Sequence, residues 1–287
     1  MEPSDSIDDD RAKYDLTHAR HDPAHCLVPG LFRSLMRGER EREKLDVTYT
    51  FGQGESLRFI CFEPLGADDM RLLQGIVALG GPKGLILEPE PDTENGRQLR
   101  LLLDAKLEAA AKDAMVVKER TTRLLSEVGM SDGGKNIKAL KASLIRMSNV
   151  SVIVTNGNQQ ASFHLMSHAI DGDDGRIMVA LNPRITEAIL GQRQHARINL
   201  KEVRALQSDP ARLIHQRLCG WLDQGKSART EIDTLCGYVW PNKVNDNAMK
   251  RRRGIAKKAL TELQAIGWTI DEYARGKWLI KRPEAPK

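Results

Sequence analysis

The chain has 287 residues, of which 40% are hydrophobic and 29% are charged, a composition typical of a globular protein with a substantial core. No run of 18 or more apolar residues occurs, which excludes a membrane-spanning helix. The four cysteines, Cys26, Cys61, Cys219 and Cys236, lack CxxC spacing, so we expect reduced thiols in a cytoplasmic protein rather than a disulfide framework or a zinc site.

The charge is unevenly distributed along the chain. Residues 241–287 contain twelve Lys/Arg and five Asp/Glu, a net charge of +7. Because the whole chain carries +5, the first 240 residues carry a net charge of −2. A positive field concentrated at one end of a nearly neutral chain indicates a polyanionic partner, and we expect double-stranded DNA.

The N-terminal part begins with an acidic segment. Residues 1–14 contain acidic residues and few apolar ones, which predicts a disordered tail and no secretory signal. Alternating patterns at 46–51 and 57–62 predict strands. Asp68 and Asp69 then open a predicted helix that we expect Gly80-Gly81-Pro82 to end.

A helical pattern follows from Asp104 to Met147, divided by a glycine-rich break into helices at about 121–127 and 135–147. Two strand-like runs, 150–155 and 161–166, flank Asn156-Gly157, the strongest short-range signal for a β-hairpin. Helix, turn, helix and hairpin is the order of a winged helix. We therefore predict an N-terminal winged-helix domain over residues 15–198.

The same order recurs towards the C-terminus. Helices are predicted at 210–224, 231–239 and 245–266, and a hairpin is predicted from strands at 268–273 and 277–281. All four tryptophans lie in this copy, where we expect them to be core anchors. The predicted fold is thus α+β, with tandem winged-helix domains, the second of which covers residues 199–287.

The helix at 245–266 carries the main functional prediction. On a helical wheel, Met249, Ala256, Ala259, Leu260 and Leu263 form a core stripe. The opposite, outer face is polar and cationic, and Asn, Arg and Lys are the residue types that contact base edges and phosphates in a major groove. The predicted DNA-binding residues of this helix and the following hairpin are Asn245, Asn247, Lys250, Arg251, Arg253, Lys257, Lys258, Arg275 and Lys277.

Three further residues in this region concern the same face. Gly254 lies on it, where a helix interior disfavours glycine by about 1 kcal/mol relative to alanine. Arg252 falls towards the core side of the wheel and does not fit the pattern. Arg282 follows the hairpin and extends its basic character.

The first copy gives a weaker signal. On the helix at 135–147, Ile137, Leu140, Leu144 and Met147 predict the buried line. Lys135, Lys138 and Arg146 are then expected on the outer face, as further DNA-binding residues that contact phosphates. A homodimer interface is the competing use of this domain.

The motifs of common enzymes are missing from the sequence. Gly133-Gly134-Lys135-Asn136 lacks the spacing and the hydroxyl of a nucleotide-binding P-loop. Pro23 interrupts the cluster of His18, His21, His25 and Cys26, so we expect no metal site there. No pattern of a nucleophile with its base is evident, and we expect neither a cofactor nor an enzyme activity.

Several longer strings resemble the replication protein C (RepC) initiators of IncQ-type broad-host-range plasmids. The strings are THARHDPAHCL (17–27), PLGADD (64–69), VALNP (179–183), LIHQRLCGWLD (213–223) and IDTLCGYVWP (232–241). The resemblance implies a tandem winged-helix initiator that binds directly repeated iterons at a plasmid origin. It also implies opening of adjacent A+T-rich DNA, where a plasmid-encoded helicase and primase act.

Two other classes stay open on the residues alone. A winged-helix transcriptional repressor would bind an operator with the same outer face. A relaxase or nuclease would need a metal-binding cluster and a tyrosine nucleophile.

Overall fold

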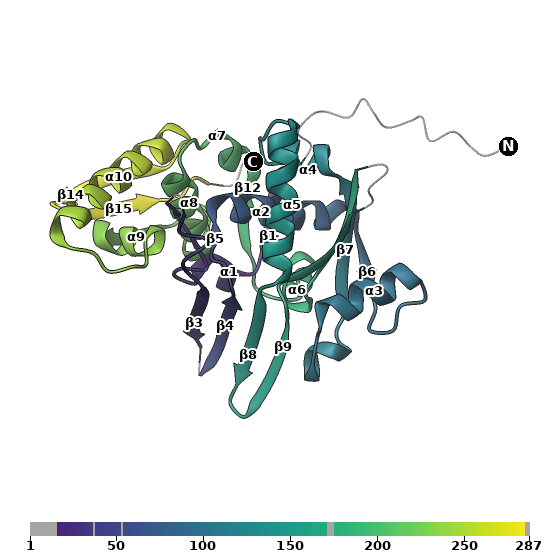
Figure 1. Ribbon diagram of the computed structural model, residues 1–287. Helices are drawn as coiled ribbons and strands as arrows, with labels where there is room; N and C mark the ends of the chain where they lie inside the picture. Colours follow the sequence, from purple (N-terminus) through teal and green to yellow (C-terminus); the bar gives the residue numbers. More distant parts are fainter. Residues whose placement is uncertain (1–15, 37, 53, 171–174, 285–287) are drawn as a thin grey trace.

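The computed structural model describes residues 16–36, 38–52, 54–170 and 175–284 (Figure 1). The predicted acidic tail, residues 1–14, lies outside the described residues. The prediction of a mixed α and β fold is confirmed. Within the described residues, no helix is both long enough and apolar enough to cross a lipid bilayer.

The larger, N-terminal part of the structure alternates helices with strands that pair mostly in antiparallel fashion. Its elements are β1 His18–His21, α1 Pro23–Leu27, β2 Phe32–Arg33, β3 Leu45–Phe51, β4 Glu55–Cys61, β5 Leu65–Gly66, α2 Ala67–Lys83, β6 Gly84–Leu87, α3 Glu94–Leu103, a 3-10 turn Leu107–Ala111, β7 Ala114–Arg120, α4 Thr121–Glu127, α5 Gly134–Ser148, β8 Ser151–Asn156, β9 Gln159–His164, β10 Met166–Ile170, β11 Arg176–Leu181, α6 Pro183–Ile189, β12 Ala196–Asn199 and α7 Leu200–Ala205. Two four-stranded sheets have the orders β3-β4-β8-β9 and β10-β11-β7-β6.

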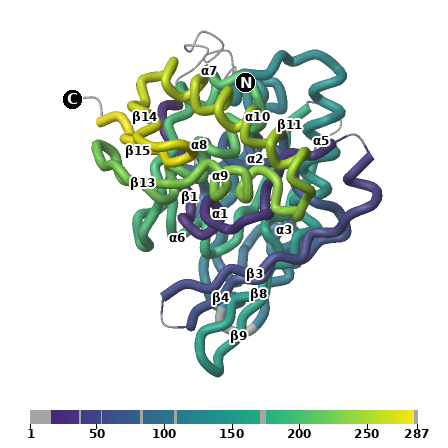
Figure 2. The backbone as a smooth tube through the Cα atoms, turned by 90° about the vertical axis from the view of Figure 1, so that its left-hand side faces the viewer, coloured from purple at the N-terminus to yellow at the C-terminus, as the bar shows by residue number. Residues whose placement is uncertain are grey.

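The predicted hairpin around Asn156-Gly157 is confirmed. β8 and β9 pair from Ser151↔His164 to Asn156↔Gln159, and Gly157 has a φ of 57°, which glycine adopts without strain. β8 also pairs with β4, so the two hairpins β3–β4 and β8–β9 form one sheet that projects downwards in Figures 1 and 2. The predicted strands at 46–51 and 57–62 correspond to β3 and β4 of this sheet, and β4 ends at Cys61.

Two sequence predictions about this part are wrong. α2 does not stop at Gly80-Gly81-Pro82 but continues to Lys83. Gly80 serves packing instead, because a Cβ there would lie 2.9 Å from Ile189 Cδ1. The helical pattern predicted from Asp104 is wrong over Ala114–Arg120, which form β7 and pair with β11 on one side and β6 on the other. Pairing within the sheet overrides the helical preference of the charged residues at the end of β7.

The C-terminal part contains α8 Asp209–Trp221, β13 Ser227–Glu231, α9 Ile232–Val239, α10 Asp246–Ala265, β14 Thr269–Ala274 and β15 Lys277–Lys281. The three predicted helices and the predicted hairpin are confirmed. The sequence did not predict β13, which pairs with β15 and makes a three-stranded sheet of order β13-β15-β14. In Figure 2 this part lies across the front of the molecule.

One hydrophobic cluster contains residues from both parts of the chain, including Phe59 and Met70 together with Leu218 and Leu260. The helix α8 lies at the junction. Its Gln216 Oε1 accepts a hydrogen bond of 2.5 Å from Gln74 Nε2 of α2, and both side chains are buried. The proposed domain boundary at 198/199 falls within β12, which pairs with β1, and it stays a prediction.

The tryptophans do not all serve as core anchors. Trp268 is buried, while Trp240 and Trp278 are half-buried and pack against the core. Trp221 is 44% exposed at the end of α8, so the prediction is wrong for this residue.

Candidate nucleic-acid interface

The helix α10 is shaped by its cap and its apolar stripe. Asn245 is the N-cap, and its side chain accepts a hydrogen bond of 3.0 Å from the Ala248 backbone N–H. Asp246 adds a negative charge to the first turn, where it complements the helix dipole. The predicted stripe is buried at Ala256, Ala259, Leu260 and Leu263. The phase of the wheel is therefore correct for this helix.

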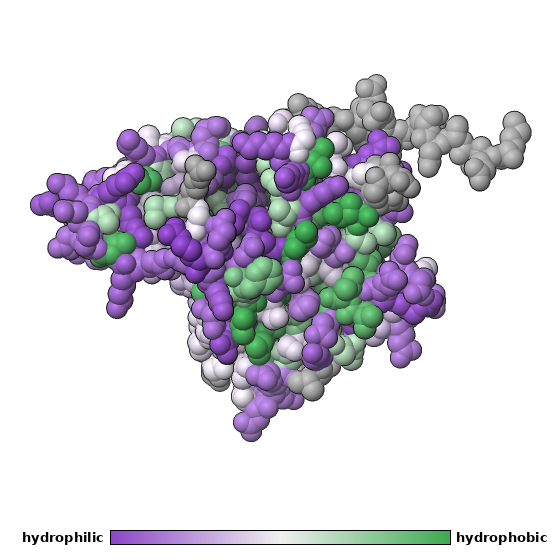
Figure 3. Space-filling view, in the orientation of Figure 1, coloured by the Kyte–Doolittle hydropathy of each residue, from purple (hydrophilic) through white to green (hydrophobic). Residues whose placement is uncertain are grey.

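The opposite face of α10 is open to solvent. Its exposed residues are Asn247, Lys250, Arg251, Arg253, Gly254, Lys257, Lys258 and Thr261. In Figure 3 the end of the molecule formed by α9, α10, β14 and β15 is predominantly hydrophilic. Within the described ranges, Asn247, Lys250, Arg251 and Lys258 make no hydrogen bond or ion pair, so their donors are available to a ligand.

Two cations of this face are already paired. Arg253 donates to both oxygens of Asp233 on α9, at 2.6 and 2.7 Å, and this hydrogen bonding lowers the pKa of Asp233. Lys257 lies 3.0 Å from a carboxylate oxygen of Glu272 and 5.4 Å from the centre of the Trp278 ring. Exposed ion pairs of this kind are screened by solvent and contribute little to stability. Phosphate groups can therefore compete for both cations at little cost.

Arg252, which the wheel places towards the core side, points away from this face. Its Nη1 donates to the carbonyl oxygen of Asn242 at 2.6 Å and to that of Trp240 at 3.4 Å, and the guanidinium lies 5.7 Å from the centre of the Trp240 ring. Arg252 thus holds the turn between α9 and α10. The wheel gave its direction correctly, and the carbonyl groups of the turn supply the reason.

The hairpin that follows α10 offers two more cations. Arg275, in the turn, and Lys277 are exposed and have no hydrogen-bond or ion-pair partner among the described residues. Arg282 was expected to extend this basic surface and does not. It is buried, and its Nη1 donates to the carbonyl oxygens of Cys219 at 3.0 Å and Leu222 at 2.7 Å, where it caps the end of α8.

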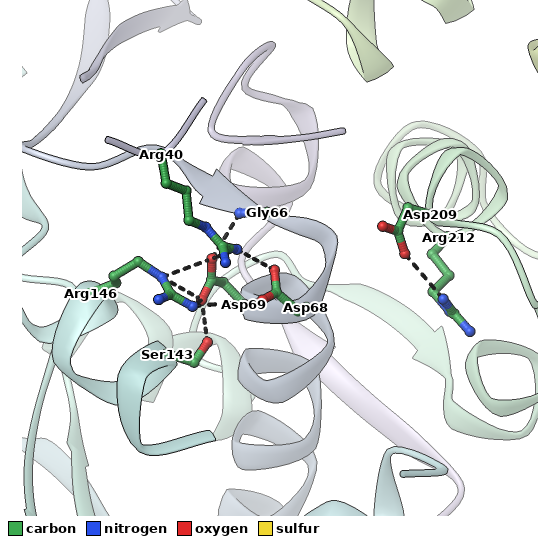
Figure 4. A network of polar contacts seen from close by, with 8 residues as sticks. All are labelled: Arg40, Gly66, Asp68, Asp69, Ser143, Arg146, Asp209 and Arg212. Carbon is green, nitrogen blue, oxygen red and sulfur yellow. Dashed lines mark hydrogen bonds and ion pairs between the residues drawn. The ribbon is translucent and has the colours of Figure 1, made fainter. Parts of the chain in front are cut away.

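The expectation that Arg146 lies on the outer face of α5 is wrong. Arg146 is buried, and its Nη2 lies 2.8 Å from Oδ1 of the fully buried Asp69 (Figure 4). Asp69 also receives hydrogen bonds from Ser143 Oγ, from Arg40 Nη2 at 3.1 Å and from the Gly66 backbone N–H at 2.8 Å. Burial and the neighbouring Asp68 raise the pKa of Asp69, and the two arginines oppose that shift.

Because Arg146 faces the core, the exposed face of α5 differs from the predicted one. Lys135 and Lys138 are exposed as predicted, and Lys141 joins them. Ile137 is only half-buried, and Ile145 is 52% exposed. The missed residue, Lys141, follows Lys138 by three positions, which is a helical spacing, but the assumed phase placed it at the side of the helix.

The described residues contain no group of three or more His, Cys, Asp or Glu side chains arranged to hold a metal ion. His21 and His25 come close to each other, with ring centres 5.5 Å apart, but both are buried. Burial lowers the pKa of each to about 3, so both rings are neutral near pH 7.

The fold resembles that of a known pair of domains. Crystal structures of domains 2 and 3 of RctB match this chain with a TM-score of 0.53 and 10% sequence identity. One match covers 90% of this chain and 96% of the RctB chain, and another covers 87% and 94%. At this identity the likeness concerns the fold alone. It extends over almost the whole of both chains.

The family follows from the sequence. The model of the family Replication protein C (RepC) matches residues 13–284. The chain therefore belongs to the RepC family, and its role is that of a replication initiator. None of the curated proteins matches the chain at a significant level.

Proposed function

We propose that this protein initiates plasmid replication by binding directly repeated iterons at the origin, with α10 as the helix that reads the major groove. The observation that carries the proposal is the exposed face of α10, where Asn247, Lys250, Arg251 and Lys258 lack partners among the described residues. Arg and Lys recognise guanine, and Asn recognises adenine.

A winged-helix reading of the C-terminal part supports this assignment. The order α8, β13, α9, α10, β14, β15 places two consecutive helices before a hairpin, and the hairpin carries Arg275 at its turn. In such a domain the second helix enters the major groove, and the hairpin is placed to contact the phosphate backbone. The order α4, α5, β8, β9 supports a similar reading of the N-terminal part, with Lys135 and Lys138 towards phosphates.

The proposed mechanism is that several protomers on adjacent repeats bend the duplex and strain an A+T-rich segment beside them. Bending a DNA site of about 20–30 base pairs costs a few kcal/mol. Many phosphate contacts together can supply this free energy. A plasmid-encoded helicase and primase would then act on the opened strands. We propose that this chain itself acts by binding and not as an enzyme.

Footprinting on the plasmid origin at two salt concentrations tests the proposal. We expect protection that repeats with the period of the direct repeats and weakens steeply as the salt concentration rises. Protection of one palindrome in a promoter would instead support the alternative, a transcriptional repressor. Nicking of supercoiled origin DNA in the presence of Mg²⁺ would contradict the proposal of a non-enzymatic role.

We also propose that the N-terminal part supports a homodimer. The strand β6 lies at the edge of its sheet, and its Leu85 and Ile86 are 63% and 48% exposed, which is typical of an edge open to further pairing. Sedimentation of the parent should show a concentration-dependent dimer that Ile86→Lys abolishes. A monomer at all concentrations would contradict this part of the proposal.

A further inference from the structure

The turn between α9 and α10 is held by a segment from the other end of the chain. The carboxylate of Glu43, which precedes β3, accepts hydrogen bonds from Asn242 Nδ2 at 3.2 and 3.4 Å. The same carboxylate lies 2.5 Å from Arg33 Nη2, so Glu43 is itself fixed in place. Residues separated by 199 positions therefore meet at the entrance to α10.

The contact continues from the turn into α10. The carbonyl oxygen of Asn242 accepts the hydrogen bond from Arg252 Nη1 at 2.6 Å. Arg252 directly follows Arg251 and lies two positions after Lys250, which are two of the unpaired residues of the outer face. Arg33, Glu43, Asn242 and Arg252 thus form a polar chain from the N-terminal part to the first two turns of α10.

Backbone contacts support the same junction. The Ser34 N–H donates to the carbonyl oxygen of Val239, the last residue of α9, at 2.9 Å. Gly30 has a φ of +84°, and a Cβ at this position would lie 3.4 Å from Pro241 Cγ. The N-terminal segment therefore follows the end of α9 and the turn closely.

The far end of α10 is fixed separately. Glu262 Oε2 accepts hydrogen bonds from the backbone N–H groups of Gln207 at 2.8 Å and Ser208 at 3.1 Å, at the start of α8. With this end held by α8, the angle of α10 depends on how its first turns are held. Those turns carry the residues that we assign to base contacts.

From these contacts we infer that Glu43 and Asn242 are positioning residues for DNA recognition, a role that rests on the proposed reading of DNA by α10. They set the direction in which Lys250 and Arg251 enter the groove, and neither needs to touch DNA. Base contacts require a precise direction, whereas contacts to phosphates tolerate a shift. Loss of the Glu43 contact should therefore reduce discrimination between sequences more than it reduces overall affinity.

The test compares two duplexes, one recovered by selection with the parent protein from a random-sequence pool and one with the same bases in scrambled order. Glu43→Ala should weaken binding to the selected duplex roughly three- to tenfold, the range for the loss of one hydrogen bond of typical net strength. Binding to the scrambled duplex and the dependence on salt should not change. Glu43→Gln keeps an acceptor for Asn242 Nδ2 and should retain most of the discrimination.

Glu41→Ala is the matched control, because Glu41 is exposed in the same segment and has no hydrogen bond or ion pair in the described part of the chain. Equal losses for Glu41→Ala and Glu43→Ala would overturn the inference, since the hydrogen bonds to Asn242, which only Glu43 makes, could not then explain them. So would an equal loss on both duplexes. If Arg251→Ala has no effect, the proposed function fails; if it weakens binding and Glu43→Ala does not, only this inference fails. Thermal unfolding of each variant checks that it is folded.

Discussion

Arginine side chains in this protein serve two opposite purposes, and their surroundings decide which. Arg146 lies 2.8 Å from the buried carboxylate of Asp69, and Arg282 donates to carbonyl groups at the end of α8. Arg251 and Arg275 are exposed and have no such partner among the described residues. A cation that already satisfies a buried acceptor supports the fold, and only a cation without that task is available to DNA.

The exposed cations of α10 should divide into two kinds by their effect on DNA binding. We expect Arg251→Ala to cost about 1–3 kcal/mol and to relax specificity at one base position, because Arg251 is placed to contact a base edge. Lys258→Ala should weaken all sequences alike and reduce the salt slope by about one unit, as expected for a phosphate contact. Gel-shift titrations at several salt concentrations measure both effects, and two variants that bind like the parent would contradict the assignment.

Arg146 should matter for stability and not for DNA. Removal of one partner from a buried ion pair leaves the other charge uncompensated and costs about 3–5 kcal/mol. We therefore expect Arg146→Ala to lower the free energy of unfolding by about that amount in a denaturant titration. Lys138→Ala, on the exposed face of the same helix, is the control and should leave stability almost unchanged. A fully stable Arg146→Ala variant with weakened DNA binding would show that Arg146 contacts DNA after all.

Sequence reasoning located most of the candidate residues on α10 because an amphipathic helix fixes the direction of every side chain. It failed for Arg146 because the partner, Asp69, is 77 positions away and no local pattern announces a buried carboxylate. It also did not foresee the pairing of Arg253 with Asp233, since such pairing depends on how α9 and α10 cross.

At the scale of a single element, α10 contains a glycine, Gly254, that the packing of the protein does not require. A Cβ on Gly254 would meet nothing within 4 Å, yet glycine in a helix interior is about 1 kcal/mol less favourable than alanine. Close approach of the DNA backbone would account for a position without a side chain.

Gly254→Ala should therefore raise the free energy of unfolding by up to about 1 kcal/mol and at the same time weaken DNA binding. Gly237→Ala is a matched control, because Gly237 lies in α9 and a Cβ there would also meet nothing within 4 Å. This control should gain stability without losing affinity. If Gly254→Ala gains stability and binds DNA as well as the parent, the DNA backbone does not closely approach Gly254.

The carboxylate of Glu202 in α7 joins a buried histidine of α8, His215, to Trp268, which directly precedes the C-terminal hairpin. His215 Nε2 lies 2.7 Å from Glu202 Oε2, which also accepts a hydrogen bond of 3.0 Å from Trp268 Nε1. Burial alone would lower the pKa of His215, but the contacts with Cys219 and Glu202 outweigh burial and raise it to about 9. The same histidine lowers the pKa of Glu202.

This pair predicts a loss of stability on the alkaline side. The pKa of His215 is higher in the folded state than the value of 6.5 expected when unfolded, so its contribution is complete below pH 6.5 and is lost as the pH rises towards 9. The shift corresponds to roughly 3 kcal/mol. We expect the free energy of unfolding of the parent to fall across this range relative to His215→Gln. Parallel pH profiles of the two proteins would contradict the assignment.

The sequence predicted elements well wherever local signals were strong. The Asn-Gly turn, the amphipathic pattern of α10 and the hairpin at its end have the predicted type and nearly the predicted bounds. β7 was missed because its charged end continues a helical pattern, and β13 because it has few strand-forming residues; the strands that pair with them lie far away along the chain. A strand that is specified by its neighbours in a sheet has little signature of its own.

At the scale of the whole molecule, the two parts of the chain are packed against each other and are not joined by a flexible linker. They share one buried cluster, and the hydrogen bonds of Gln216 and of Arg217 tie α8 to the N-terminal part, through the Gln74 side chain and the Leu27 carbonyl oxygen. Sequence reasoning placed a boundary between them because the order of elements repeats. It could not show that α8 packs on both sides of that boundary.

Because the two parts share one buried cluster, the distance between their surfaces is fixed by the fold. If both parts contact one DNA site, their separation along the duplex is set by the protein and cannot stretch. Insertion of five base pairs in the middle of the site should abolish binding, and insertion of ten, about one helical turn, should fail to restore it. A protein whose two parts were joined by a flexible linker would regain binding when ten base pairs are inserted. Quantitative footprints on the two lengthened sites therefore distinguish a rigid from a flexible connection.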